Sequence, residues 1–168
     1  EDFSDFKGQK IRTMEDPYQL LFWKKLGSNP TPMNFSEVYI GLQQNTIDAQ
    51  ENPYEVIVSN RLYEQQDYII ETNHVPHLIS LVVSEAFFEE LSGEDQQILI
   101  DAQEIAKEYA REQSDERISE RIQVIKDSGT EIITLDEGTT EEMKEASRSV
   151  YDEIAEVVDP EILELYSR

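Results

Sequence analysis

The chain has 168 residues, which suits one domain or two small lobes able to bury roughly two-thirds of the surface of the unfolded state. Its 37 Asp and Glu against 14 Lys and Arg give a formal net charge of −23, and without a basic cluster this argues against nucleic acid as a partner. The chain contains no cysteine for a thiolate or disulfide, and no apolar run approaches the roughly 18 residues that cross a bilayer.

The first 62 residues alternate between strand and helix signals. Asp16 and Pro17 are a typical helix cap and first helical residue, and Gly27 is a typical helix stop. The prolines of "NPTPM" favour an extended segment, because each restricts the residue before it. We expect strands or extended segments at 9–13, 29–33 and 47–52, and helices at 17–26, 36–45 and 53–62.

Two further strands are predicted before the middle of the chain. "DYIIET" (67–72) has the composition of a strand, and "HLISLVVS" (77–84) is a nearly unbroken apolar run, typical of a strand buried on both faces. Between them, Asn73 and Pro76 interrupt the pattern at the only plausible boundary, where a hinge is expected.

The second half is mostly helical. Ser92 and Asp95 form a capping box that opens a helix to about Lys126, with apolar positions at both ends and a polar middle at 111–117. A helix with this pattern suggests a strut crossing between two packed bodies. Gly129 ends it, "EIITL" (131–135) is a strand, and a last helix is expected from Thr139, capped by Glu142, through Val158. The alternation of strands and helices predicts an α/β fold.

Sequence motifs for catalysis and metal binding are weak. His74 and His77 are separated by a proline and come with no third ligand, so a metal site is not predicted. Carboxylates are too numerous to pair from sequence, and neither a phosphate-binding glycine loop nor a nucleophile elbow is present. We therefore expect no cofactor and no enzymatic activity.

A family resemblance runs through most of the chain. The segments "DFKGQKIR", "KKLGSNPTPMNFSEVYIGLQQNTIDAQENP" and "LYEQQDYIIETNHV" resemble the dicarboxylate-type solute-binding receptors of tripartite ATP-independent periplasmic (TRAP) transporters, and "VSEAFFEELSGEDQQILIDAQEIAKEY" extends the match. The segment "DFKGQKIR" resembles the point at which the chain of such receptors enters the second of two lobes. The resemblance therefore implies the C-terminal half of a receptor, without the N-terminal half and without a signal segment.

The resemblance also implies an organisation and a function. The fold would be the second α/β lobe of a two-lobed periplasmic-binding-protein-like protein, with partial first-lobe elements. The function would be extracytoplasmic binding of a small organic carboxylate, in the periplasm or tethered to the outside of a membrane, for delivery to TRAP membrane subunits. The implied segments are 1–73 in the second lobe, 74–91 returning to the first lobe, 92–128 as a lobe-spanning helix, and 129–168 as a strand and C-terminal helices.

Arg12 is the principal candidate ligand-binding residue. The resemblance implies that this arginine forms a bidentate pair with the ligand carboxylate. A planar guanidinium suits that role, because it presents two parallel donors that a lysine cannot reproduce. In so acidic a chain a local positive site would also offset the repulsion of an incoming anion. The alternative is an arginine paired with a surface carboxylate.

Four other residues are candidates through the same resemblance. Asn52 resembles a ligand-contacting amide, although Asn before Pro is also common in turns. Phe35 resembles an aromatic wall of the pocket and can equally be a hydrophobic staple ahead of Ser36. Glu15 would either meet a ligand ammonium group or face water. His77, where the chain re-enters the first lobe, would either tune specificity or serve only the hinge.

Two alternative functions remain on sequence grounds. A helical interaction or scaffold protein would use 92–126 as a coiled coil, but the missing apolar positions at 111–117 count against a continuous seam. An enzyme on this fold is the third alternative. If the first half is absent, "HLISLVVS" and "EIITL" would lie in an incomplete sheet, and the chain is expected to self-associate or to be ordered mainly in its second lobe.

Overall fold

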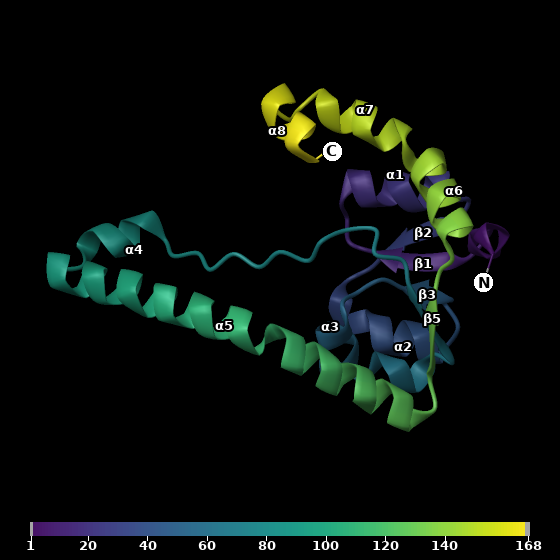
Figure 1. The fold of residues 1–168 in the computed structure, drawn as a ribbon, viewed down its shortest axis with the longest axis horizontal. Coiled ribbons are helices and arrows are strands. Elements are labelled where there is room, and N and C mark those ends of the chain that lie inside the picture. The colour runs from purple at the N-terminus through teal and green to yellow at the C-terminus, as the bar shows by residue number, and fades with distance from the viewer. Residues whose placement is uncertain (1, 167–168) are drawn as a thin grey trace.

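The structure is a computed structural model that describes residues 2–166, and it is an α/β fold with two parallel sheets (Figure 1). The first sheet has the strand order β2-β1-β3 and the second the order β4-β5. The strands are β1 (Lys10–Thr13), β2 (Asn29–Pro32), β3 (Ala49–Gln50), β4 (Tyr68–Glu71) and β5 (Glu131–Thr134).

The three strands of the first sheet lie within the segments predicted to be strands or extended, and β3 is shorter than predicted. β1 is the central strand, and its Arg12 lies opposite Thr31 of β2 and Gln50 of β3. The two prolines of β2 are tolerated because this strand is at an edge, where a missing N–H costs no ladder hydrogen bond on the outer side. The sheet is thus short but its register is well defined.

Short helices connect these strands. Asp16 caps the first of them, and its Oδ1 accepts a hydrogen bond from the Gln19 N–H at 2.8 Å. The helical segments before β4 are η1 (Phe3–Phe6), α1 (Pro17–Lys25), η2 (Phe35–Glu37), α2 (Val38–Gln43), α3 (Tyr54–Ser59) and η3 (Leu62–Gln65). The helix predicted to run to residue 62 ends at Ser59, because Arg61 takes a left-handed φ of 56° that interrupts it.

The core consists of two clusters. One contains Val38, Leu42, Ile47, Ile57, Leu62 and Ile125, and involves α2, α3 and the long helix α5 (Gly93–Ser128). The other contains Ile11, Trp23, Leu26 and Met143, and involves α1 and α6 (Glu137–Ser147). Figure 1 shows α1 and α6 on the opposite side of the strands from α2, α3 and α5. The fold is therefore a sheet layer with helices on both faces.

The long helix is confirmed, with its predicted start and stop. Ser92 Oγ accepts from the Asp95 N–H at 3.2 Å, and Gly129 ends the helix with a φ of 92°. Ile125 is its buried residue, near the carboxyl end. The amino-terminal half of α5 runs away from the body of the molecule together with α4 (Glu85–Glu90), as Figure 1 shows. The sequence predicts a helix that crosses between two packed bodies, but within the described residues α5 packs against only one.

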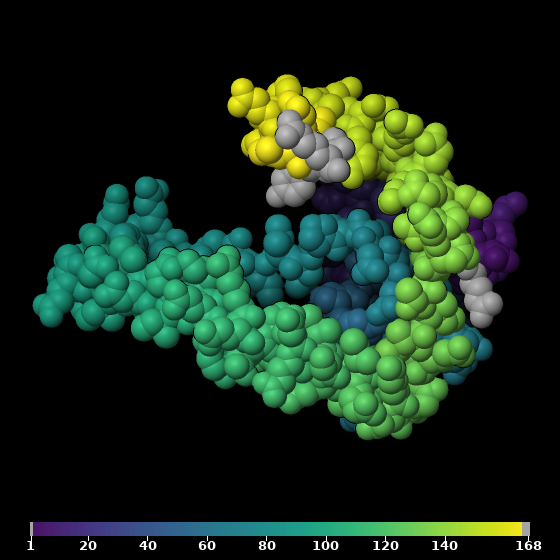
Figure 2. All heavy atoms as spheres, viewed as in Figure 1, coloured from purple at the N-terminus to yellow at the C-terminus, as the bar shows by residue number. Residues whose placement is uncertain are grey.

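The strand predicted at 77–84 is wrong. These residues are extended but form no ladder, and the large apolar side chains between Leu78 and Val82 are 77 to 86% exposed. A strand is stable only when its N–H and C=O groups find a neighbouring strand, and within residues 2–166 none lies beside this segment. Figure 2 shows it running through the hollow between α5 and the C-terminal helices.

The C-terminal helices also differ from the prediction. The cap is Asp136, whose Oδ1 accepts from the Thr139 N–H at 2.7 Å, so α6 begins at Glu137 and Thr139 already lies in its first turn. The single predicted helix is divided into α6, α7 (Ser149–Ala155) and α8 (Pro160–Tyr166). No helix in the described part of the chain is long and apolar enough to cross a membrane.

Candidate functional site

The candidate site lies where the three strands of the first sheet end. Arg12 is near the carboxyl end of β1, Phe35 follows β2, and Asn52 follows β3. The parallel register places these ends at one edge of the sheet. In open α/β sheets that edge is where ligands usually bind, because side chains of several strands converge there.

Arg12 is held in a defined orientation. Its side chain is buried, Nε donates to the Met33 carbonyl oxygen at 3.0 Å, and Cζ lies 5.5 Å from the centre of the Phe35 ring. Desolvation lowers the pKa of the Arg12 guanidinium, and the attraction of Glu51 partly opposes this. In the described residues no side chain accepts from the two terminal nitrogens, which leaves their fork available to an anion.

Glu51 and His74 form a second part of the site. Desolvation raises the pKa of the Glu51 carboxyl, with Arg12 acting in the opposite direction, and burial lowers the pKa of His74 to about 4. His74 Nε2 lies 3.8 Å from Glu51 Oε2, but a neutral imidazole at neutral pH makes this a polar contact rather than an ion pair. The His74 ring stacks on Phe22 at a centroid distance of 5.2 Å, and its Nδ1 lies 2.7 Å from Thr72 Oγ1.

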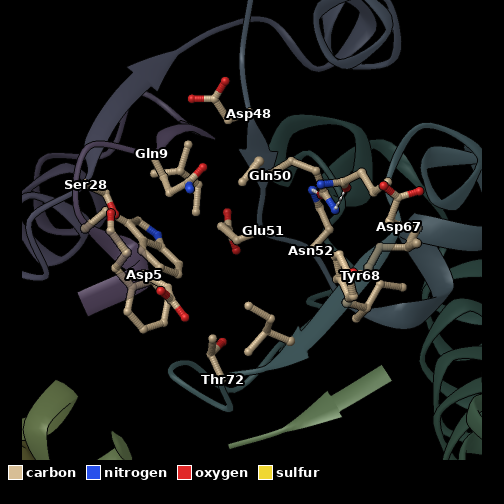
Figure 3. Close-up of a pocket in the computed structure, with 18 of the residues that line it drawn as sticks. Asp5, Gln9, Ser28, Asp48, Gln50, Glu51, Asn52, Asp67, Tyr68 and Thr72 are labelled. Carbon is tan, nitrogen blue, oxygen red and sulfur yellow. Dashed lines mark hydrogen bonds between the residues drawn. The ribbon is translucent and has the colours of Figure 1, made fainter. Parts of the chain in front are cut away.

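Two cavities adjoin Glu51, and neither of them is lined by Arg12 or Phe35. One of about 420 Å³ lies between β3 and β4, and one of about 690 Å³ lies between α3, β4 and α5. Glu51 and Asn52 line both of them. Figure 3 shows Glu51 near the centre of the smaller cavity, between Gln9 and Asn52. The Asn52 Nδ2 already donates to Gln50 Oε1 at 2.7 Å, so the side chain is oriented by β3.

The five residues expected from sequence are only partly brought together. Arg12 and Phe35 are in contact. Asn52 follows Glu51 in the sequence, and Glu51 attracts Arg12 electrostatically. Glu15 is exposed beyond the end of β1 and lines neither cavity. His77 is exposed and lines the larger cavity together with Asn52.

Sequence reasoning missed Glu51 and His74 as members of the site. Both adjoin residues that were singled out, in "ENP" and "TNH", but the contact joins segments 23 positions apart and has no local signature. The signal available was His74 itself, a histidine beside the predicted hinge. No group of three or more potential metal ligands occurs in residues 2–166.

Comparison with known proteins identifies the family. Residues 1–157 match the family described as bacterial extracellular solute-binding protein, family 7 (DctP). The chain belongs to this family. The basic residue, aromatic ring and amide at the carboxyl edge of the sheet therefore lie in a DctP solute-binding fold.

Several DctP relatives are similar over most of the chain. The 2,3-diketo-L-gulonate-binding periplasmic protein of Escherichia coli K12 is 40% identical over 131 residues, covering 78% of this chain and 40% of its own length. The ectoine-binding periplasmic protein of Halomonas elongata is 34% identical over 163 residues, covering 96% and 48%. The chain thus spans about half or less of the length of these relatives.

Solved structures agree with the fold. A TRAP periplasmic solute-binding protein from Polaromonas sp. JS666 bound to D-erythronate matches with a TM-score of 0.89 and 30% identity, over 98% of this chain and 54% of that one. A TRAP solute-binding protein from Roseobacter denitrificans with bound L-galactonate gives a TM-score of 0.82 and 32% identity, over 98% and 53%. The α/β fold and the family expected from sequence are both confirmed.

Proposed function

We propose that this chain forms the carboxylate-binding lobe of an extracytoplasmic receptor that delivers a small organic acid to a TRAP membrane transporter. The observation that carries the proposal is Arg12. Its Nε donates to the Met33 carbonyl and its guanidinium lies over the Phe35 ring, so the group is oriented while its terminal nitrogens keep their donors for a ligand. A carboxylate that meets two parallel donors in a partly dry site forms a strong, directional pair.

The ligand set of the relatives supports this substrate class. D-Erythronate and L-galactonate, bound in the two similar structures, are sugar acids, and each has a carboxylate and several hydroxyl groups. Gln50, which lies opposite Arg12 in the sheet, and Glu51, which attracts Arg12, offer amide and carboxylate partners for hydroxyl groups, and Asn52 donates to Gln50 beside them. Glu51, rather than the exposed Glu15, is the acidic residue placed to meet a positively charged part of a ligand such as ectoine.

The remaining assignments belong to the same proposal. Receptor action requires the periplasm or another extracytoplasmic location, TRAP membrane subunits as partners, and a first lobe that closes over Arg12. Residues 1–73 would supply the second lobe, 74–91 the return to the first lobe, and 92–128 the helix between lobes. The chain would carry out no chemical step, because its site is built to hold a ligand through orientation and charge.

The proposal is tested by titrating the chain with D-erythronate, L-galactonate and ectoine while the arginine Nε–H signals are followed by NMR. A single lobe leaves the ligand wet on one side, so we expect weak binding, on the order of 1 mM or weaker. The Arg12 signal should shift in a saturable way with at least one ligand. Replacement of Arg12 by lysine should abolish the saturable shifts at the neighbouring backbone amides.

Arg148 provides a matched control, because its side chain is exposed between α6 and α7 and pairs with Glu145. The Arg148→Lys variant should bind as the unmodified chain does. If no carboxylate up to about 20 mM moves the Arg12 signal, or if Arg12→Lys binds as well as the unmodified chain, the assignment of Arg12 to a carboxylate site is wrong.

A further inference from the structure

The turn that carries Glu51 and Asn52 leads into a helix that has no capping side chain. We call it the Asn52 turn and define it as residues 51–53, which join β3 to α3. Pro53 is the N-cap of α3, and a proline side chain has no oxygen to accept from the free N–H groups of the first turn. The orientation of Glu51 and Asn52 therefore depends on what holds the helical residues that follow them.

Tyr54, the first residue of α3, is anchored to Glu71. Its hydroxyl donates to Glu71 Oε1 at 2.6 Å, and the other carboxylate oxygen, Oε2, accepts from Thr134 Oγ1 at 2.6 Å. These two bonds, that from Thr134 first, lower the pKa of the Glu71 carboxyl. Burial and then the bond to Glu71 raise the pKa of the Tyr54 phenol, so it keeps the proton that it donates. Hydrogen bonds to an ionised acceptor are roughly twice as strong as neutral ones.

Glu71 and Thr134 are the last residues of two paired strands. β4 ends at Glu71 and β5 at Thr134, and the two residues are partners in the parallel register. After β4 the chain leaves the body of the molecule toward α4, and after β5 it passes to the C-terminal helices, as Figure 1 shows. One carboxylate thus fastens the first turn of α3 to the place where both segments leave the sheet.

Glu55, the second residue of α3, is anchored to the long helix. Its Oε2 accepts from Arg121 Nε at 2.9 Å, and its Oε1 accepts from Arg117 Nη2 at 3.1 Å. The hydrogen bond from Arg121 is the largest cause that lowers the pKa of Glu55 to about 2. Such partly exposed ion pairs are individually weak. Together with the bond of Tyr54, however, they restrain the first turn of α3 from two different elements.

The two segments that Tyr54 and Glu71 join also meet at their other ends. Glu51 lies three positions before Tyr54, and His74 lies three positions after Glu71. His74 Nε2 is 3.8 Å from Glu51 Oε2. Residues 51–54 and 71–74 are thus held together at both ends, and Asn52 lies between the two contacts.

We propose that Tyr54 and Glu71 are positioning residues of the ligand site, whose hydrogen bond holds the Asn52 turn in the orientation that presents Glu51 and Asn52 to a ligand of Arg12. The inference rests on the proposed function, because these residues act on that same site. The competing role is direct contact with the ligand, since both side chains line the larger cavity together with Asn52. Measurements made without ligand distinguish the two roles.

The test compares two tyrosines that each donate to a glutamate. Tyr54→Phe removes the bond to Glu71, whereas Tyr39→Phe removes a bond to Glu64 of 3.0 Å, and neither residue of that second pair lines a cavity. Amide relaxation is measured by NMR on the 168-residue chain without ligand. Tyr54→Phe should lower the backbone order parameters of Glu51 and Asn52 from about 0.85 to about 0.6 or less. Tyr39→Phe should leave them unchanged, and a melting curve shows that each variant is folded.

A second arm titrates the same chains with D-erythronate, L-galactonate and ectoine, the probes of the Arg12 experiment. Tyr54→Phe and Glu71→Gln should each weaken the binding of the probe that shifts the Arg12 signal by about three- to tenfold, a modest loss of the size expected for one hydrogen bond. Tyr39→Phe should bind as the unmodified chain does. The double variant Tyr54→Phe/Glu71→Gln should bind no more weakly than the weaker single variant, because the two side chains act as a pair.

Three results would overturn the proposal. These are unchanged order parameters in Tyr54→Phe, lowered order parameters without a loss of affinity, and losses that simply add in the double variant. If the unmodified chain binds none of the three probes, the proposed function fails instead. The order parameters then still decide whether Tyr54 and Glu71 hold the Asn52 turn.

Discussion

At the scale of single residues, Arg12 shows how one cation is oriented for ligand binding in a chain with a net charge of −23. Its position on β1, the Met33 carbonyl and the Phe35 ring together fix its direction. Glu51 is near enough to attract it but does not occupy its terminal nitrogens. Burial strengthens the attraction to a ligand, because a guanidinium and a carboxylate interact more strongly in a low-dielectric site than in water.

In a receptor completed by a first lobe, Arg12→Ala should weaken carboxylate binding by about 2–5 kcal/mol, roughly 30- to several thousand-fold. Arg12→Lys should lose nearly as much, since a lysine cannot form the fork. Calorimetry on a fusion with the unmatched half of the Halomonas elongata relative would measure this. Arg148→Ala is the control, and equal affinity in the Arg12 and Arg148 variants would remove Arg12 from the site.

His74 should make stability depend on pH. Its pKa falls from an ordinary 6.5 to about 4 on folding, so above pH 6.5 it contributes nothing, and stability is lost as pH falls from 6.5 to 4, because only the unfolded chain takes up the proton. We expect a loss of about 1–3 kcal/mol in this range. The raised pKa of Glu51 acts in the opposite direction, since the folded state binds that proton more readily.

Denaturant unfolding between pH 4 and 7 checks this expectation. The slope of unfolding free energy against pH should be flatter in His74→Phe, which keeps an aromatic ring against Phe22 and cannot titrate. His77→Phe, at an exposed position, is the control and should keep the original slope. If His74→Phe and the unmodified chain lose stability in parallel, His74 is not buried in its neutral form.

At the scale of elements, α5 is packed at its carboxyl end and exposed at its amino end. Its carboxyl end contacts α3 and β5, where Ile125 is fully buried and Arg121 Nε donates to Glu55 Oε2 at 2.9 Å. Its amino-terminal half exposes Ile98, Ile105 and Tyr109, which the sequence places on one helical stripe. An apolar stripe therefore indicates which face of a helix can be buried, while the presence of a packing partner decides whether it is.

Two alanine substitutions compare the stability contributions of the packed and exposed ends of α5. Ile125→Ala should destabilise the chain by about 2–4 kcal/mol, because it removes a fully buried side chain from a core cluster. Ile105→Ala, which trims a side chain that is 68% exposed, should change stability by about 0.5 kcal/mol or less. Equilibrium denaturation measures both, and similar losses would mean that the outer half of α5 is packed in solution.

At the scale of the whole molecule, much apolar surface lies away from the core. The apolar arm, which we define as residues 78–83 together with Phe87 and Ile98, is exposed along its length. So many exposed apolar side chains are unusual for a soluble monomer and normally mark an interface.

We expect the chain on its own to self-associate through the apolar arm. Light scattering coupled to size exclusion should give a mass above 19.5 kDa that increases with protein concentration. Leu81→Asp combined with Val82→Lys should shift the chain toward the monomer, because both side chains lie exposed in the arm. Ile162→Asp, an exposed apolar position on α8, is the control; a concentration-independent mass of 19.5 kDa would contradict the prediction.

The sequence by itself determined the local elements and the principal candidate residue. Caps and stops at Asp16, Ser92 and Gly129 act within a few residues, so α1 and α5 could be placed without tertiary contacts. Periodicity, with the family resemblance, also led to Arg12 on β1. Tertiary structure decided what depends on distant partners: β4 pairs with β5 some 60 positions later, His74 reaches Glu51, and residues 77–84 stay unpaired. A strand is defined by its neighbours, because its backbone hydrogen bonds are made between segments, whereas a helix makes most of its own.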